Sequence, residues 1–112
     1  MSAITSHVLD TSLGVPVAAL EVSLALLEGS SFREVGRGLT DADGRIRQLL
    51  GGSALVRGTY RLSFEVGAHY QTTARPYFYE RIEIQFQVTS LEQHYHVPLL
   101  LSPFGYSTYR GT

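Results

Sequence analysis

The chain contains no cysteine, no tryptophan and no lysine. The absence of cysteine excludes a disulfide framework, a thiolate zinc site, an iron–sulfur cluster and a cysteine nucleophile. All nine basic residues are arginine, and ten acidic residues bring the formal net charge to −1. Such a near-neutral balance gives no electrostatic footprint for nucleic acid or for an anionic membrane surface.

Long apolar segments are missing as well. No segment reaches the ~18 uncharged apolar residues that a membrane-spanning helix requires. Residues 1–8 contain no basic start followed by an apolar run, so we expect no secretory signal and a cytosolic location. The length of 112 residues predicts one domain over residues 1–112, because a second core of normal size would not fit.

The dominant hydrophobic period is two residues, which is typical of strands with one buried and one solvated face. The one stretch without clear alternation, residues 68–74 ahead of Pro76, predicts a single short helix. Many short strands with almost no helix predict an all-β, two-sheet sandwich of antiparallel strands. The expected strands cover residues 4–9, 20–26, 32–40, 60–66, 82–88, 94–101 and 105–110.

Two turns are expected at positions that matter for function. Residues 41–44 predict a tight turn in which Gly44 can adopt positive φ. This turn begins like a calcium loop, but it lacks the further oxygen ligands and the spaced glutamate that calcium binding needs. Residues 102–105 predict a hairpin turn between the last two strands.

Histidines are the main candidates for chemistry. On a strand, His94 and His96 point to the same face, so the pair could be half of a metal site with His7 as a third ligand. The same pair could act in catalysis or binding, or could be two structural histidines on a sheet surface. The pattern leaves these three interpretations open, whereas His69 is expected to be an ordinary surface residue.

The last residues are aromatic and β-prone almost to Thr112. A dispensable tail is usually small, polar and frayed, so we expect this segment to be paired and packed. It is either an ordinary final strand or a segment whose residues, Tyr109 and Arg110 among them, line a site.

The C-terminal run of residues 94–112, HYHVPLLLSPFGYSTYRGT, resembles the signature of the 5-hydroxyisourate hydrolase family. These are the transthyretin-related proteins of urate catabolism. Residues 6–16 and 40–45 match the family as well, so the resemblance spans essentially the whole chain. The histidines and the Tyr-Arg-Gly ending separate this family from the thyroid-hormone carrier transthyretin, which is similar in fold.

The resemblance implies a transthyretin-like sandwich of two four-stranded sheets with one short helix. It also implies a homotetramer in which outward sheet faces of two dimers form a channel, with sites at the dimer–dimer interface. The implied activity is hydrolysis of 5-hydroxyisourate to 2-oxo-4-hydroxy-4-carboxy-5-ureidoimidazoline, without a metal or other cofactor. The family pattern carries the catalytic roles to His7, Arg45 and His96. It carries substrate binding to His7, Arg45, Tyr109, Arg110, Gly111 and Thr112.

The implied roles follow the ordinary chemistry of these side chains. His7 and His96 would share activation of water and return of the proton, because the histidine pKa lies near neutrality. Arg45 would hold the anionic substrate and stabilise negative charge on a carbonyl oxygen. The family usually ends in serine, whereas this chain has Thr112, which keeps the hydroxyl and adds a methyl group.

The sequence pattern is also compatible with two other functions. A transthyretin-like carrier would bind a small aromatic ligand in the channel without performing chemistry. A β-sandwich interaction module of a larger enzyme would need neither the histidines nor a packed C-terminal segment. The set of His7, Arg45 and His96 together with the Tyr-Arg-Gly ending favours the hydrolase.

Overall fold

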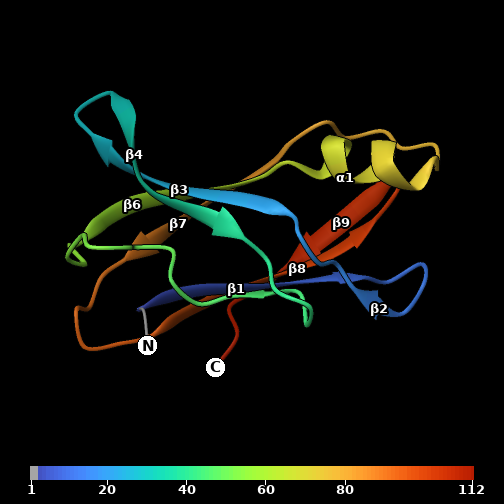
Figure 1. The fold of residues 1–112 in the computed structure, drawn as a ribbon. Helices are drawn as coiled ribbons and strands as arrows, with labels where there is room; N and C mark the ends of the chain where they lie inside the picture. Colours follow the sequence, from blue (N-terminus) through green and yellow to red (C-terminus); the bar gives the residue numbers. More distant parts are fainter. Residues whose placement is uncertain (1–2) are drawn as a thin grey trace.

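The computed structural model describes residues 3–112, which form two β-sheets packed face to face with one helix at one end (Figure 1). The first sheet contains β2 (Val15–Pro16), β1 (Ile4–Asp10), β8 (Tyr95–Ser102) and β9 (Gly105–Thr108), in that order. The two-residue strand β5 (Arg45–Ile46) also pairs with β1. Strand β8 pairs with one edge of β1. Strands β5 and β2 share the other edge, so the sheet is four strands wide.

The second sheet contains β4 (Ser31–Leu39), β3 (Glu21–Glu28), β6 (Gly58–Phe64) and β7 (Ile82–Val88), in that order. All of its pairings are antiparallel. Three of these strands, β3, β6 and β7, come from the segments with the clearest alternation. The predicted all-β, two-sheet sandwich with one short helix is therefore confirmed.

The expectation that all strands are antiparallel is wrong for one pair. Strands β1 and β8 run parallel, with Thr5 opposite His96 and His7 opposite Pro98. A parallel neighbour cannot be joined by a tight turn, so this pair brings together strands from opposite ends of the sequence. This pairing places residues near the two ends of the described chain side by side.

The helix α1 (Val66–Thr73) begins two residues before the predicted position. It ends at Thr73, and the left-handed φ of 55° at the C-cap residue Ala74 breaks the helical backbone ahead of Pro76. Beyond it, Arg75 forms an ion pair with the buried carboxylate of Asp10 at the end of β1. No helix in the described part of the chain is long and apolar enough to cross a membrane.

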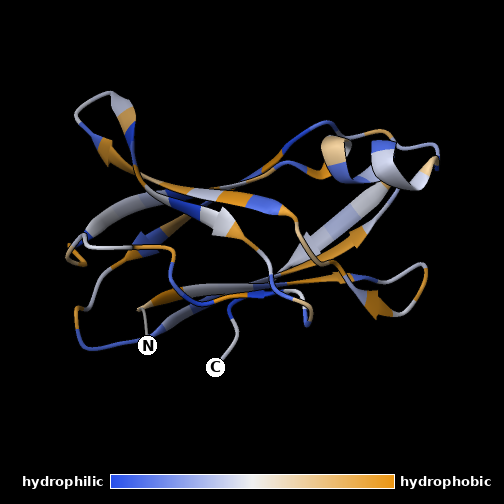
Figure 2. Cartoon of the chain, viewed as in Figure 1, coloured by the Kyte–Doolittle hydropathy of each residue, from blue (hydrophilic) through white to orange (hydrophobic). Residues whose placement is uncertain are grey.

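The core lies between the sheets and is built by alternation along the strands, visible as orange and blue stretches in Figure 2. Val8, Leu62, Phe64 and Leu99 are fully buried there. Burying one such side chain contributes about 1.5–3 kcal/mol, so the core fixes which face of each strand points outward. Thr5 and His7 of β1 and His96 of β8 are thereby directed to the outer face of the first sheet, whereas Ser6 of β1 is buried on the inner face.

Candidate functional site

The outer face of β1 carries Thr5 and His7. Ile4 and Val8 are fully buried on the opposite face, so His7 points outward. The parallel register puts Thr5 beside His96 on β8. On the other edge of β1, His7 pairs with Arg45 of β5, so three of the predicted residues lie on one face.

The turn at residues 41–44 fixes the orientation of His7. Gly44 has the expected positive φ, 77°, and a Cβ there would lie 2.4 Å from the carbonyl oxygen of Val8. This close packing brings the backbone carbonyl of Asp43 to 2.8 Å from Nε2 of His7. A carbonyl only accepts, so Nε2 donates and the Nδ1 lone pair of a neutral His7 stays available.

Arg45 follows the turn directly, and its backbone N–H donates to Oδ1 of Asp41 at 3.0 Å. Its neighbour Arg47 uses its guanidinium in an ion pair with Asp41 at 2.9 Å. Within residues 3–112, the guanidinium of Arg45 has neither an ion-pair partner nor a hydrogen-bond partner. Arg45 therefore has its donors free for a ligand.

Thr5 links His94, which lies just before β8, to His96 on β8. Its Oγ1 lies 2.9 Å from Nε2 of His94 and 2.8 Å from Nδ1 of His96. The two rings are nearly parallel, with centroids 6.4 Å apart. No motif in the sequence points to Thr5, because its position beside His96 follows from the parallel register.

The electrostatic surroundings of His96 favour its neutral form. Burial lowers the pKa of His96, and the positive charge of Arg45 and the neighbouring His94 and His7 lower it further. Its ring is therefore neutral near pH 7 and has one nitrogen free to act as a base.

The terminal segment closes over His96. The backbone N–H of Gly111 donates to the carbonyl of His96 at 2.8 Å, and the two residues form an isolated bridge. A Cβ on Gly111 would lie 2.6 Å from Cδ2 of His96, so only glycine permits this approach. The predicted final strand is too long, because β9 ends at Thr108 and only Gly111 pairs beyond it.

A cavity of about 360 Å³ opens on this face. Its volume lies within the range of roughly 300–1,000 Å³ that is usual for small-molecule sites. Three predicted residues, Arg45, His96 and Thr112, contribute to its wall, and His7 lies beside Arg45. The wall also includes Thr5, His94 and Arg47.

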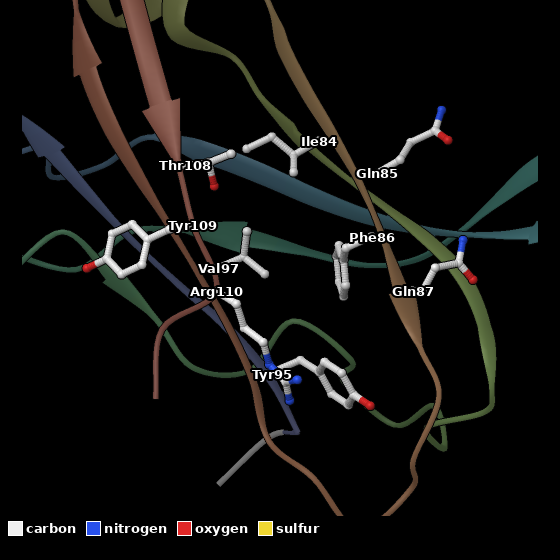
Figure 3. Close-up of a pocket in the computed structure, with 9 residues that line it drawn as sticks. All are labelled: Ile84, Gln85, Phe86, Gln87, Tyr95, Val97, Thr108, Tyr109 and Arg110. Atoms are coloured by element: carbon white, nitrogen blue, oxygen red, sulfur yellow. The ribbon is translucent and has the colours of Figure 1, made fainter.

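Tyr109 and Arg110 lie elsewhere. They line a second cavity of about 240 Å³ together with residues of β7 and Tyr95 (Figure 3). The guanidinium of Arg110 stacks on the ring of Tyr95 at 4.6 Å and donates to Oε1 of Gln93 at 2.9 Å. Within one chain, the structure therefore does not bring these two predicted residues into the cavity that contains His96.

The remaining histidine differs from its expectation. His69 on α1, predicted to be an ordinary surface residue, is half-buried, and burial, followed by the charge of Arg75, lowers its pKa. It contacts the ring of Tyr70 and takes no part in the cluster around His96. Among the described residues, no group of three histidine or acidic side chains is arranged to hold a metal ion.

Comparison with known sequences identifies the family. The profile of the HIUase/Transthyretin family matches residues 4–111. The chain belongs to this family. A 5-hydroxyisourate hydrolase from Caulobacter vibrioides is 43% identical, and the alignment covers 100% of both chains.

Solved structures show the same fold in two kinds of protein. The chain is similar to the 5-hydroxyisourate hydrolase of Klebsiella pneumoniae, with a TM-score of 0.85, 37% identity and 100% coverage of both chains. It is also similar to sea bream transthyretin in complex with thyroxine, with a TM-score of 0.91, 27% identity and coverage of 99% and 96%. The backbone alone thus does not separate an enzyme from a carrier in this family.

Proposed function

We propose that this protein hydrolyses 5-hydroxyisourate to 2-oxo-4-hydroxy-4-carboxy-5-ureidoimidazoline in urate catabolism. The observation that carries the proposal is the cavity lined by both a neutral His96 and Arg45, whose guanidinium has no partner within residues 3–112. The names of full-length relatives at about 40% identity support the substrate. The fold alone does not, since it is also that of a thyroxine-bound protein.

The reaction opens a ring amide by attack of water. Water must lose a proton as it attacks, the carbonyl oxygen must be stabilised as it becomes negative, and the leaving nitrogen must gain a proton. His96 and His7 share the two proton transfers, because each can present one nitrogen lone pair when neutral. General acid–base catalysis of this kind supplies about 10²–10⁴-fold.

Arg45 binds the anionic substrate and stabilises the developing oxyanion. Its guanidinium is planar, remains charged and has no competing carboxylate in the described chain. Preorganised donors of this type cost no rearrangement when the charge develops. The ring is already activated by oxidation, so the proposal requires neither a metal nor a covalent nucleophile.

The terminal residues orient the substrate. Gly111 holds the segment against His96, and Thr112 reaches the cavity wall, where its hydroxyl can form hydrogen bonds. A substrate-binding role for Tyr109 and Arg110 stays a prediction. Within one chain, the contact of Arg110 with Tyr95 fixes the path of the terminal segment.

The cavity is open to solvent in a single chain, and assembly would enclose it. We infer a homotetramer in which the outer faces of the first sheets of two dimers meet and place the sites in a shared channel. Support comes from the similarity to transthyretin and from the polar residues concentrated on this face. Excluding water in this way would strengthen the interaction of Arg45 with the oxyanion.

The test generates the unstable substrate in place. Urate oxidase converts urate to 5-hydroxyisourate, and the decay of its ultraviolet band is followed with and without the protein. We expect a decay that accelerates in proportion to protein concentration and that a chelator does not slow. A decay rate equal to the spontaneous rate at every protein concentration would contradict the proposal.

A carrier is the second candidate, because the TM-score to thyroxine-bound transthyretin is 0.91. The carrier function predicts binding of a small aromatic ligand, measured by calorimetry, without accelerated decay of 5-hydroxyisourate. Replacement of His96 would separate the two, since it should abolish turnover but need not affect a carrier that binds through apolar contacts.

A further inference from the structure

We propose that Thr5 and His94 form a positioning relay that moves protons between His96 and solvent. The inference rests on the proposed hydrolytic function, which uses His96 as an acid and a base. Neither Thr5 nor His94 belongs to the residues to which the sequence resemblance assigns a role. Both act through His96 and need not touch the substrate.

The geometry centres on a single hydroxyl. Oγ1 of Thr5 is within hydrogen-bond distance of one nitrogen on each ring, Nε2 of His94 and Nδ1 of His96. Thr5 is only 4% exposed, so bulk water does not compete for these bonds. A buried hydroxyl that served packing alone would be satisfied by a single backbone carbonyl, as the neighbouring Ser6 hydroxyl is by Val97.

One hydroxyl hydrogen allows two directed chains. In the first, Nδ1–H of His96 donates to Thr5, whose hydroxyl donates to His94, and Nε2 of His96 is a free base. In the second, His94 donates to Thr5, Thr5 donates to Nδ1 of His96, and Nε2 of His96 carries a proton. The hydroxyl therefore links the tautomer of His96 to that of His94.

Proton transfer along the hydrogen-bonded series His96, Thr5 and His94 conserves both protons and charge. When attacking water gives a proton to Nε2 of His96, the ring becomes a cation. Nδ1–H then passes to Oγ1 of Thr5 while the hydroxyl hydrogen passes to Nε2 of His94. His96 ends neutral with its proton on Nε2, and the positive charge is on His94. The reverse shift accompanies donation from Nε2 to the leaving nitrogen and restores the starting state.

The surroundings favour moving the charge outward. His96 is half-buried and faces His7 and Thr5 from β1, Arg45 from β5 and the terminal segment with Gly111 and Thr112. Burial and the charge of Arg45 lower the pKa of His96, so a cation there is disfavoured. His94 is exposed, and water can solvate a positive charge on its ring.

The first test removes and restores the hydroxyl. Thr5→Val should lower kcat by about 10-fold, a fraction of a full acid–base contribution. It should leave KM little changed and move the acid limb of the pH profile to lower pH, because the cation of His96 loses an acceptor. Thr5→Ser should restore kcat and the pH profile. Thr11→Val is the matched control, since the Thr11 hydroxyl bonds the carbonyl of Leu101 away from the histidines.

Two outcomes would overturn the inference. One is a Thr5→Val enzyme with the kcat and pH profile of the wild type. The other is equal loss in Thr5→Val and Thr5→Ser, which would indicate packing of the threonine methyl group instead of proton transfer.

The second test uses the exposure of His94. His94→Ala should lower kcat, and added imidazole should restore it in proportion to its concentration, because a small base can take the vacated position. His69→Ala is the control: the substitution should leave kcat unchanged, and added imidazole should not alter it. A His94→Ala enzyme that imidazole does not rescue would contradict the relay.

A measurement without substrate separates this inference from the proposed function. Nitrogen-15 spectra of labelled histidine report the tautomer of His96, which should carry its proton on Nδ1 in the wild type and lose that preference in Thr5→Val. Absence of turnover in the wild type would contradict the hydrolase proposal and leave the spectra to decide the link through Thr5. Turnover with a His96 tautomer independent of Thr5 would overturn the relay alone.

Discussion

The outer faces of the two sheets are both polar, yet their charges are arranged differently. On the second sheet, Arg37 bridges Glu21 at 2.6 Å and Glu34 at 2.7 Å, and Arg81 pairs with Glu65 at 2.7 Å. On the first sheet, Arg45 has no such partner within residues 3–112. The histidines there bond to neutral groups, a hydroxyl and a carbonyl.

This difference shows where chemistry is possible. Neutralised pairs on an exposed face have their donors and acceptors occupied, and solvent screens what charge remains. Arg45, whose guanidinium has no partner within residues 3–112, keeps its capacity to bind a ligand, and the neutral ring of His96 keeps its capacity to transfer protons. The alternating pattern of the strands is similar in both sheets, so the partners of the polar residues distinguish the two faces.

The largest effect should come from His96. His96→Ala removes the proposed acid–base group and should lower kcat by about 10²–10⁴-fold. Circular dichroism should show an intact fold, because the side chain lies on the outer face. Wild-type turnover in this variant would contradict the assignment of the first sheet as the active face.

Arg45→Ala should reduce kcat/KM by about 10²–10³-fold through loss of oxyanion stabilisation. It should also change the pH dependence. Activity requires neutral His96 and falls as the pH drops through its pKa, which lies below the ordinary value of about 6.5. Removing a positive neighbour raises that pKa, so the acid midpoint of kcat/KM should move to higher pH. A midpoint that stays in place or falls would contradict this coupling.

Gly111→Ala should have a smaller effect on the same face. The added Cβ would lie 2.6 Å from the ring of His96, so the terminal segment or the ring must move. Misplacement by about 1 Å costs up to about 10²-fold, and we expect kcat to fall by about 10-fold or more while the core stays folded. Gly52→Ala is a suitable control, because no atom lies within 4 Å of a Cβ at that position.

Arg37→Ala on the second sheet should have the smallest effect. The side chains of this pair are about half exposed, so its loss should lower the melting temperature only slightly. Turnover and the acid midpoint should match the wild type in the same assays. A large loss of activity here would show that the two faces are not functionally separate.

The strands were predictable because burial of one face imposes the period of two. Strands β3, β6 and β7 lie where the alternation is clearest, within one to two residues of their predicted bounds. The two-residue strands β2 and β5 were not predictable, because two residues cannot display a period. The parallel pairing of β1 with β8 was missed for a related reason, since alternation specifies a face but not a neighbour.

The candidate site was partly predictable. The family motif identified His7, Arg45, His96 and Thr112, which the structure gathers on one face. The same motif could not place Arg110, whose direction depends on stacking against Tyr95. The role of Thr5 could not be predicted from the sequence, because threonine is common in strands. Only the pairing register gives it two histidine neighbours.

The parallel pairing of β1 with β8 also has a consequence for synthesis of the protein. Thr5 and His96 are separated by 91 positions, so β1 leaves the ribosome long before its partner exists. Contacts of such sequence separation close slowly, because a long loop must be ordered before they form. The sheet containing β3, β4 and β6 can assemble earlier from nearby segments. A chain interrupted before residue 94 would thus contain β3, β4 and β6 but would lack His96 and the strand that pairs in parallel with β1.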